Sequence, residues 1–354
     1  MADGGIMAIT DVREAIAWQA EHAAKAGAPN TARVIRAELA ILDTDTGLAR
    51  RMSNWAGLSL EDAMPLRVAG GLHWLVLSGA DRGLEPVYAG LTTDQATIDA
   101  IVAGLATQYD APLMAWLDSP PQTNEAGRSA SFMAALLWLS QRLGPKFEMN
   151  EIGASAGVNT MMERYRYDLG GVEVGPADSP MRLKPEWRGP PPPRGEVEIV
   201  AIRGCDTAPV GLADPAEALR LKAYVWPDAL DRMGRIDASA ALAGQSPPLI
   251  ERKDAGTFVE ERLEAPQEPG VTRVLYHSIV WQYLPEATRR SITAAIEQAG
   301  TRATADKPLA WVRLETNRET FRHELTVRFW PGGDEPALLA EAHPHGAWVE
   351  WLGP

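Results

Sequence analysis

FEMNEIGASAGVN, at residues 147–159, is the stretch that decides the expected fold. Its apolar first half is typical of a buried strand, and Gly153 and Gly157 favour a sharp turn because glycine has no Cβ. A helix is expected after the turn. Strand, turn and helix in this order are typical of parallel α/β sheets, whose ligands bind beyond the carboxyl ends of the strands.

Two chemistries fit this turn. The pattern Glu151-x-Gly153-x-Ser155-x-Gly157 is typical of the turn that cradles S-adenosylmethionine in Rossmann-like methyltransferases. The pattern Gly153-x-Ser155-x-Gly157 also fits a nucleophile elbow of the α/β-hydrolase type, with Ser155 as the attacking group. The surrounding sequence decides between them.

The chain around this turn divides into two regions. Up to about residue 145, apolar residues recur at helical spacing, and helices are expected at 11–26, from 30 or 31, from 65, at 93–108 and at 126–143. Beyond that point, short apolar runs alternate with helical stretches, as in a mostly parallel sheet. Strands are expected at 147–152, 197–203, 249–252, 271–276, 309–314, 324–330 and 347–351, and helices at 156–167, 214–225, 228–243 and 285–299.

These patterns predict an α/β fold with a Rossmann-like methyltransferase sheet. The expected domains are an N-terminal all-helical cap region at 1–145 and a Rossmann-like domain at 146–354. The glycine- and proline-rich residues at about 168–195 are expected to form a surface insertion. No helix is evident between the last two strands, so these two are expected to pair as a C-terminal antiparallel hairpin.

Composition narrows the class of partner. The 354 residues carry 47 acidic and 34 basic side chains, a net charge of -13. No basic run is present, so we expect neither nucleic acid nor an anionic membrane as partner. No long apolar run, secretory signal or second cysteine beside Cys205 is visible. We expect a cytoplasmic protein that binds a small-molecule substrate, and the oligomeric state stays open.

The methyltransferase interpretation draws support from several strand ends in series. Asp206 ends the second strand, where an acid can accept both ribose hydroxyl protons. Asp254 and Ala255 follow the third strand, where the adenine amino group is often contacted. His277 ends the fourth, facing the donated methyl group. The predicted S-adenosylmethionine site is Glu151, Gly153, Ser155, Gly157, Asn159, Asp206, Asp254, Ala255 and His277. About 53 residues separate Gly153 from Asp206, where about 20 are usual, and the insertion accounts for the excess.

Catalytic roles are predicted for four side chains. His277 has a suitable ordinary pKa to act as general base on a substrate hydroxyl or amine. Glu125 and Arg128 are expected to orient the methyl acceptor, and Tyr283 to line its pocket. His343 and His345 flank a proline without a third clear ligand, so no metal site is expected.

Two alternatives stay open. A serine hydrolase would use Ser155, Asp206 or Asp254, and His277 or His345, although helices precede the serine and no HGGG-like loop lies upstream. The other alternative is a non-catalytic module that keeps the cofactor-binding fold.

Several unusual segments carry a resemblance to a known family. These are SPPQTNEAGRSA at 119–130, EIGASAGVN, RYRYDLGG, WRGPPPP, RGCD, YVWPD, HSIVWQYLP, WPGG and HPHG. They run through nearly the whole chain, which resembles the bacterial domain of unknown function 2332. The resemblance implies a bacterial protein of this architecture and no particular activity.

Overall fold

The computed structural model describes residues 9–333 and 335–353. Its contacts divide the chain into two compact units. The helical unit comprises residues 9–123 and 215–234, and the sheet unit comprises residues 124–214 and 235–353. The division passes through helix α10 (Leu230–Gln245), and the segment 124–145 belongs to the sheet unit.

The helical unit consists of short helices around one apolar core that includes Ile35, Met52 and Leu72. Asp11 caps the first helix by accepting a hydrogen bond from the Glu14 N–H at 2.8 Å. The helices are α1 (Val12–Lys25), α2 (Pro29–Ile41), α3 (Gly47–Ser53), α4 (Met64–Leu77), α5 (Glu85–Tyr88), α6 (Gln95–Gln108), α7 (Asp110–Met114), the 3-10 helix η1 (Ala115–Asp118) and α9 (Pro215–Ala223).

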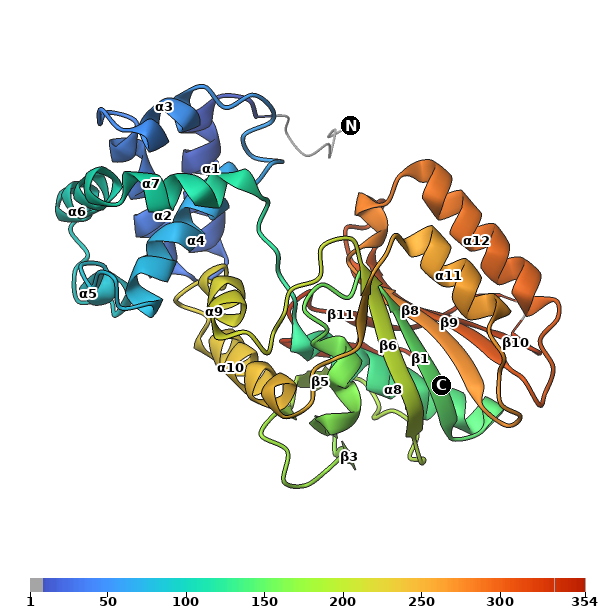
Figure 1. Ribbon diagram of the computed structural model, residues 1–354. Helices are drawn as coiled ribbons and strands as arrows, with labels where there is room; N and C mark the ends of the chain where they lie inside the picture. Colours follow the sequence, from blue (N-terminus) through green and yellow to red (C-terminus); the bar gives the residue numbers. More distant parts are fainter. Residues whose placement is uncertain (1–8, 334, 354) are drawn as a thin grey trace. The chain divides into compact units, whose positions relative to one another are not determined.

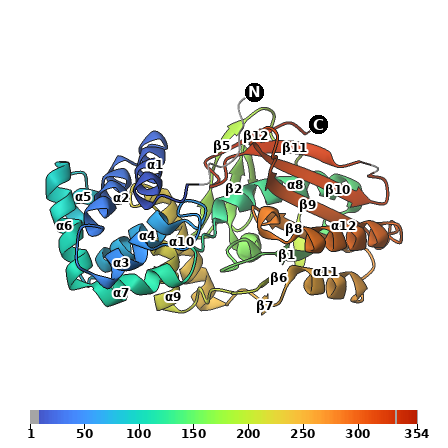
Figure 2. The same ribbon diagram turned by 90° about the horizontal axis from the view of Figure 1, so that it is seen from above.

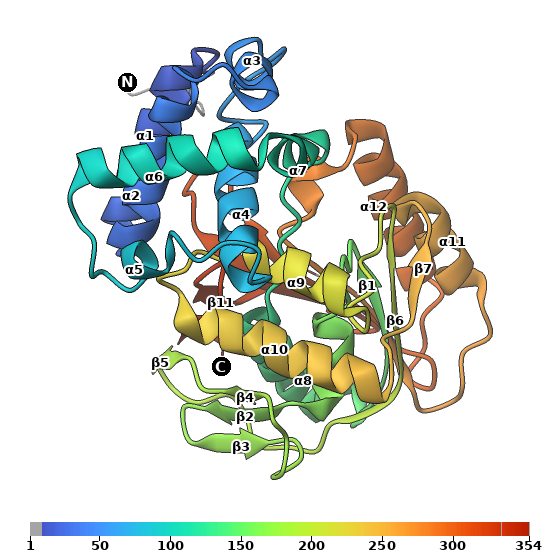
Figure 3. The same ribbon diagram turned by 60° about the vertical axis from the view of Figure 1, so that its left-hand side comes forward.

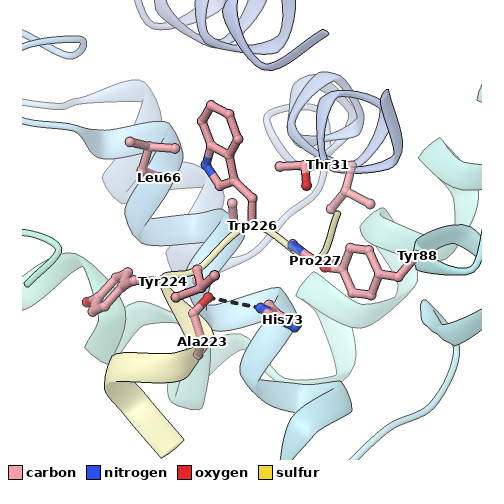
Figure 4. A pocket seen from close by; sticks show the side chains of 12 residues that line it. Thr31, Leu66, His73, Tyr88, Ala223, Tyr224, Trp226 and Pro227 are labelled. Carbon is pink, nitrogen blue, oxygen red and sulfur yellow. Dashed lines mark hydrogen bonds between the residues drawn. The ribbon is translucent and has the colours of Figure 1, made fainter. Parts of the chain in front are cut away.

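A small pocket in the helical unit forms around the segment that follows α9 (Figure 4). Asp228 holds this segment to the start of α2 by accepting from the backbone N–H and the hydroxyl of Thr31, at 2.8 and 2.7 Å. His73 Nδ1 lies 3.1 Å from the Ala223 carbonyl oxygen, and burial lowers the pKa of its ring to about 4. The pocket holds about 20 Å³, room for one water molecule, and residues of the YVWPD motif form part of its lining.

The sheet unit is built on a nine-stranded sheet with the order β7-β6-β1-β8-β9-β10-β11-β12-β5. The five strands from β7 to β9 are parallel, and β9 to β12 form an antiparallel series. Figure 1 labels β6, β1, β8, β9 and β10 of this sheet. The strands are β1 (Lys146–Ile152), β5 (Glu186–Arg188), β6 (Glu198–Asp206), β7 (Ile250–Arg252), β8 (Thr272–Ser278), β9 (Leu309–Thr316), β10 (His323–Trp330), β11 (Ala337–Ala342) and β12 (Trp348–Trp351). The expected mixed α/β class with a mostly parallel sheet is confirmed.

Helices cover both faces of the sheet. Helices α11 (Ala255–Glu264) and α12 (Glu286–Gly300) lie on one face and α8 (Ser129–Leu143) on the other (Figure 2). Alternation along β8 matches this arrangement. Leu275 packs into the cluster that contains Val259 of α11 and Ile292 of α12, whereas the next residue, Tyr276, meets Phe132 of α8 with ring centroids 5.0 Å apart.

The helix expected at 156–167 is wrong. The turn is followed by the 3-10 helix η3 (Asn159–Arg164) and by β2 (Arg166–Leu169), which forms a small second sheet with β3 (Val172–Val174) and β4 (Arg182–Leu183). Two buried tyrosine hydroxyls take backbone carbonyls that a helix would use: Tyr165 donates to Val158, and Tyr167 donates to Met162 at 2.7 Å. These contacts fix a non-helical path.

The expected C-terminal hairpin is also wrong in its pairing. β11 lies between β10 and β12, which therefore do not pair with each other. The β11 sequence ALLAEA consists of strong helix formers, and pairing on both sides overrides this local preference. The segment at 168–195 is only partly a surface insertion, because β5 joins the edge of the large sheet beside β12 and Trp187 stacks on Trp351.

None of the helices between residues 9 and 353, residue 334 apart, has the length and apolar composition that a membrane span requires.

Candidate functional site

The carboxyl ends of adjacent parallel strands bring the predicted cofactor residues to one edge of the sheet. β7, β6, β1 and β8 lie side by side in parallel register (Figure 2), and they end at Arg252, Asp206, Ile152 and Ser278. The glycine turn after β1 therefore lies between the end of β6 and the end of β8.

The turn needs its two glycines. Gly153 and Gly157 have φ angles of +70° and +73°. An added Cβ at Gly153 would lie 2.4 Å from Val280 Cγ2, and one at Gly157 would lie 2.8 Å from Pro248 Cβ. Ser155 has φ +52°, in the left-handed region where a side chain is strained. Such strain persists only where surrounding contacts impose the conformation, and here the contact comes from Asp206.

Asp206 fixes the turn to the end of β6. Its Oδ2 accepts a hydrogen bond from the Ser155 N–H at 2.9 Å, and its Oδ1 accepts one from the Ala208 N–H at 2.9 Å. The side chain is half-buried, and each carboxylate oxygen retains a further lone pair. Within the described residues, the buried Ser155 hydroxyl oxygen has no hydrogen-bond partner.

Glu151 lies beneath the turn rather than facing outward. It is buried, and its carboxyl oxygens lie 3.4 Å from Asn159 Nδ2 and 3.4 Å from the Tyr276 hydroxyl. Asn159 is held in turn by the Ser129 hydroxyl at 2.8 Å. Burial raises the pKa of the Glu151 carboxyl to about 8, so this group is mostly protonated at neutral pH and serves as part of an internal network.

His277 is placed at the end of β8 as predicted, but its ring is fully enclosed. The Trp311 indole N–H, which can only donate, lies 3.1 Å from His277 Nε2. Nε2 is therefore the acceptor, and Nδ1 carries the proton that it donates to Glu315 Oε1 at 2.6 Å. Trp281 stacks on the ring at 4.9 Å. No ring nitrogen is left to take a substrate proton, so we assign His277 a structural role in place of the predicted general base.

Glu125 and Arg128 lie together near the end of β8. Glu125 Oε1 accepts from the Gly127 N–H at 2.9 Å and from Arg235 Nε at 2.7 Å. Arg128 donates through Nε to the Pro344 carbonyl at 2.8 Å, and its Nη1 lies 3.3 Å from the Ser278 hydroxyl. Both side chains are buried. The predicted pair is thus brought to the same edge of the sheet as the turn.

The remaining predicted residues lie at the edges of this arrangement. Asp254 is exposed and caps α11 by accepting from the Thr257 N–H at 3.0 Å, and Ala255 is buried behind it. Tyr283 is 75% exposed in the 3-10 helix η4 (Trp281–Tyr283) and lies on the surface. The His345 N–H donates to His343 Nδ1 at 3.1 Å. Among the described residues, no group of three or more histidine, cysteine, aspartate or glutamate side chains is arranged to hold a metal ion.

The sequence interpretation missed Glu315 and Arg235. Glu315 also accepts from the N–H groups of Val280 and Trp281, at 3.2 and 3.3 Å, and so fixes the loop after β8. It lies near the end of β9, and the strand-end rule that selected Asp206 and His277 also points to this position. Arg235 lies within a helix, and no local pattern marks it as the partner of Glu125.

No curated protein and no solved structure matches this chain. One family model matches residues 13–351, nearly the entire chain, and confirms the expected membership. The protein belongs to the family described as "Uncharacterized protein conserved in bacteria (DUF2332)".

Proposed function

We propose that this protein binds S-adenosylmethionine at the carboxyl ends of β1 and β6 and transfers its methyl group to a small molecule. The observation that carries the proposal is the hydrogen bond between Asp206, at the end of β6, and Ser155, in the glycine turn after β1. Asp206 stands where a Rossmann-like methyltransferase binds the ribose of its cofactor. The turn with Ser155 stands where the backbone of such an enzyme approaches the cofactor closely.

The strand order supports the same location. From β1 the chain proceeds outward to β6 and β7, then returns to the other side of β1 as β8 and β9. The order therefore reverses between β1 and β8, and ligands of open α/β sheets bind at such switch points. The antiparallel series beyond β9 departs from the usual methyltransferase sheet, and its β11–β12 turn reaches this edge, where the Pro344 carbonyl accepts from Arg128 at 2.8 Å.

The residues present fit the proposed cofactor. The free lone pairs of Asp206 can accept ribose hydroxyls, and the unpartnered Ser155 hydroxyl lies in the turn that the cofactor would approach. The missing helix after the turn matters little, because this cofactor has no phosphate that a helix N-terminus would stabilise. When bound, it would supply an electrophilic methyl group.

The proposed chemistry relies on position rather than on a base. Both ring nitrogens of His277 are already hydrogen-bonded. Methyl transfer would therefore depend on alignment of the acceptor and exclusion of water. Arg128 and Ser278, at the end of β8, are the polar side chains that we propose for contact with the acceptor, with Glu125 and Arg235 holding the segment in place.

The serine-hydrolase alternative has one observation in its favour. Ser155 follows a strand in the left-handed conformation, as in a nucleophile elbow. Its hydroxyl, however, has no histidine partner among the described residues, and both oxygens of Asp206 accept backbone N–H groups. A triad needs a serine–histidine contact. Labelling of Ser155 by a fluorophosphonate, abolished in Ser155→Ala, would favour the hydrolase instead.

Isothermal titration of the full chain with S-adenosylmethionine and S-adenosylhomocysteine tests the proposal. We expect micromolar binding that Asp206→Ala weakens at least about tenfold, by loss of charge-assisted hydrogen bonds. Asp306→Ala, an exposed aspartate in the same unit, is the control. Absence of binding by a folded sample would refute the proposal. Binding without methyl transfer to any acceptor would favour the non-catalytic module.

A further inference from the structure

A second pocket lies in the sheet unit, on the face of β1 and β6 that α11 covers. It holds about 270 Å³ and is lined by residues of the first two-thirds of these strands, by the end of α11 and by the loop that follows α11. Four of its lining side chains are charged: Arg203, Arg262, Glu148 and Glu268. We call it the arginine pocket.

The two arginines of this pocket each carry a buried donor that no acceptor of the described protein meets, and the Arg262 guanidinium lies 5.8 Å from the Phe258 ring centroid. Within the described residues, the Nε–H groups of Arg203 and Arg262 are buried with no hydrogen-bond acceptor. Buried polar groups are almost always hydrogen-bonded, because an unmet donor loses its hydration without compensation. Two such donors in a single pocket indicate that the acceptor is supplied from outside the chain.

Arg273, a neighbouring arginine, differs from these two because its donors have protein acceptors. Arg273 is buried and saturated: it donates to Glu148 Oε2 at 3.1 and 3.2 Å, to the Ala265 carbonyl at 2.9 Å and to the Pro266 carbonyl at 2.8 Å. Glu148 is thereby neutralised by a residue other than Arg203 and Arg262.

The other nearby acid is also engaged. Glu251 accepts from Lys253 at 2.9 Å, and this bond, together with the charges of Arg262 and Arg203, lowers the pKa of its carboxyl. Glu268 is exposed. Lys253 also donates to Glu261 at 2.5 Å, so its single charge is shared between two carboxylates. The pocket therefore presents two guanidinium groups whose Nε–H donors are unmet, beside the exposed carboxylate of Glu268.

The sheet leaves the pocket accessible. β7 pairs only with Gly204, Cys205 and Asp206, so within the described residues the first part of β6 has no strand on that side (Figure 3). Val200, on this open stretch, is 43% exposed. A ligand can therefore reach Arg203 from the edge of the sheet.

We propose that the arginine pocket binds a small free anion that carries a carboxylate or phosphate group. The planar guanidinium group matches both in bidentate geometry, and charge-assisted hydrogen bonds of this kind are among the strongest in proteins. The volume accommodates a small metabolite. The anion would tie α11 and the loop after it to β6. The pocket lies toward the amino ends of the strands, so it is separate from the proposed cofactor site, and either proposal can fail alone.

Thermal unfolding and isothermal titration of the full chain test this site. The probes are inorganic phosphate and succinate, with sodium chloride at equal ionic strength as reference. We expect one probe or both to raise Tm by a few degrees above the chloride reference, and the difference between them identifies the preferred group. In the double variant Arg203→Gln/Arg262→Gln, Kd should rise at least about tenfold, whereas Arg318→Gln, an exposed arginine of the same unit, should bind as the wild type.

A second variant separates binding from folding. Without added anion, Arg203→Met should be as stable as the wild type or more stable, because it removes an unsatisfied buried donor. Equal Tm shifts in the wild type and the double variant, or no shift beyond chloride, would overturn the proposal. Marked destabilisation of Arg203→Met without anion would also overturn it, since that result would show that the guanidinium group already has a partner.

Discussion

The carboxyl-end site and the arginine pocket of the sheet unit differ in how their buried polar groups are bonded. At the carboxyl ends of β1 and β8, His277 and Glu151 are enclosed and bonded to other side chains. In the arginine pocket, the Nε–H groups of Arg203 on β6 and Arg262 on α11 are buried without a hydrogen-bond acceptor in the described protein. The comparison teaches that burial of a polar side chain does not mark a binding residue. A hydrogen-bonding group that has no partner in the protein does mark one. By that criterion the proposed site at the carboxyl ends of the strands rests on Asp206 and Ser155.

The largest effect is expected from the turn itself. Gly153→Ala places a Cβ in the left-handed region and 2.4 Å from Val280 Cγ2, so it should cost about 3–5 kcal/mol of unfolding free energy. Chemical denaturation measures it. The matched control is Gly270→Ala, which has φ +74° but nothing within 4 Å and should cost only about 1–2 kcal/mol. Equal costs would mean that the turn does not approach Val280 as described.

The next effect tests whether His277 is structural. His277→Ala removes the partner of both Trp311 and Glu315, and it should cost about 2–4 kcal/mol. Glu315→Gln, which keeps an acceptor, should cost less. Stability of the wild type and both variants can be compared by urea unfolding. If His277→Ala kept full stability while methyl transfer disappeared, the general-base role would be restored and the contrast between the two sites would fail.

The pH dependence of stability tests whether the Glu151 carboxyl is buried and hydrogen-bonded within the protein. The Glu151 carboxyl has a pKa of about 8 in the folded protein, against 4.5 as its ordinary value. The folded state therefore binds the proton more tightly than the unfolded state does. The contribution of this group to the free energy of unfolding is complete below about pH 4.5 and is lost as pH rises through about 8. Between pH 6 and 9 the wild type should lose about 3 kcal/mol through this group.

Glu151→Gln should remove this loss, since glutamine stays neutral throughout. Part of the pH slope should remain, because burial also raises the pKa of Glu38 in the helical unit well above its ordinary value. Glu38→Gln is the matched variant for that part. An unchanged slope in Glu151→Gln would show that this carboxyl is ionised and open to solvent or to a ligand.

The smallest effect on stability is expected at Asp206. Asp206→Asn leaves a single acceptor for the two N–H groups of Ser155 and Ala208, so it should cost about 1 kcal/mol by urea unfolding. Asp306→Asn, an exposed control, should cost nothing measurable. A loss as large as that in His277→Ala would make Asp206 a structural residue and leave the carboxyl end without a binding group.

Local patterns predicted the strands and the turn well, because buried parallel strands and left-handed glycines leave short-range signals. The same patterns were wrong where distant contacts override local preference. The helix after Gly157 gives way to bonds from Tyr165 and Tyr167, and ALLAEA becomes β11 because strands on both sides pair with it.

The site shows a similar division. The positions of Asp206 and His277 follow from the rule that functional residues lie at strand ends. The role of His277 depends on Trp311 and Glu315, which lie 34 and 38 residues along the chain, and no pattern in the sequence pairs them. The arginine pocket was missed entirely, since Arg203 and Arg262 lie on separate elements and only the fold brings them into one cavity.

The most direct test of the central claim is amide hydrogen exchange of the full chain with and without S-adenosylhomocysteine. We expect slower exchange in residues 153–160 and 204–210, the turn after β1 and the end of β6, with no change around the arginine pocket. Unchanged exchange in both segments at saturating ligand, or protection confined to the helical unit, would contradict it.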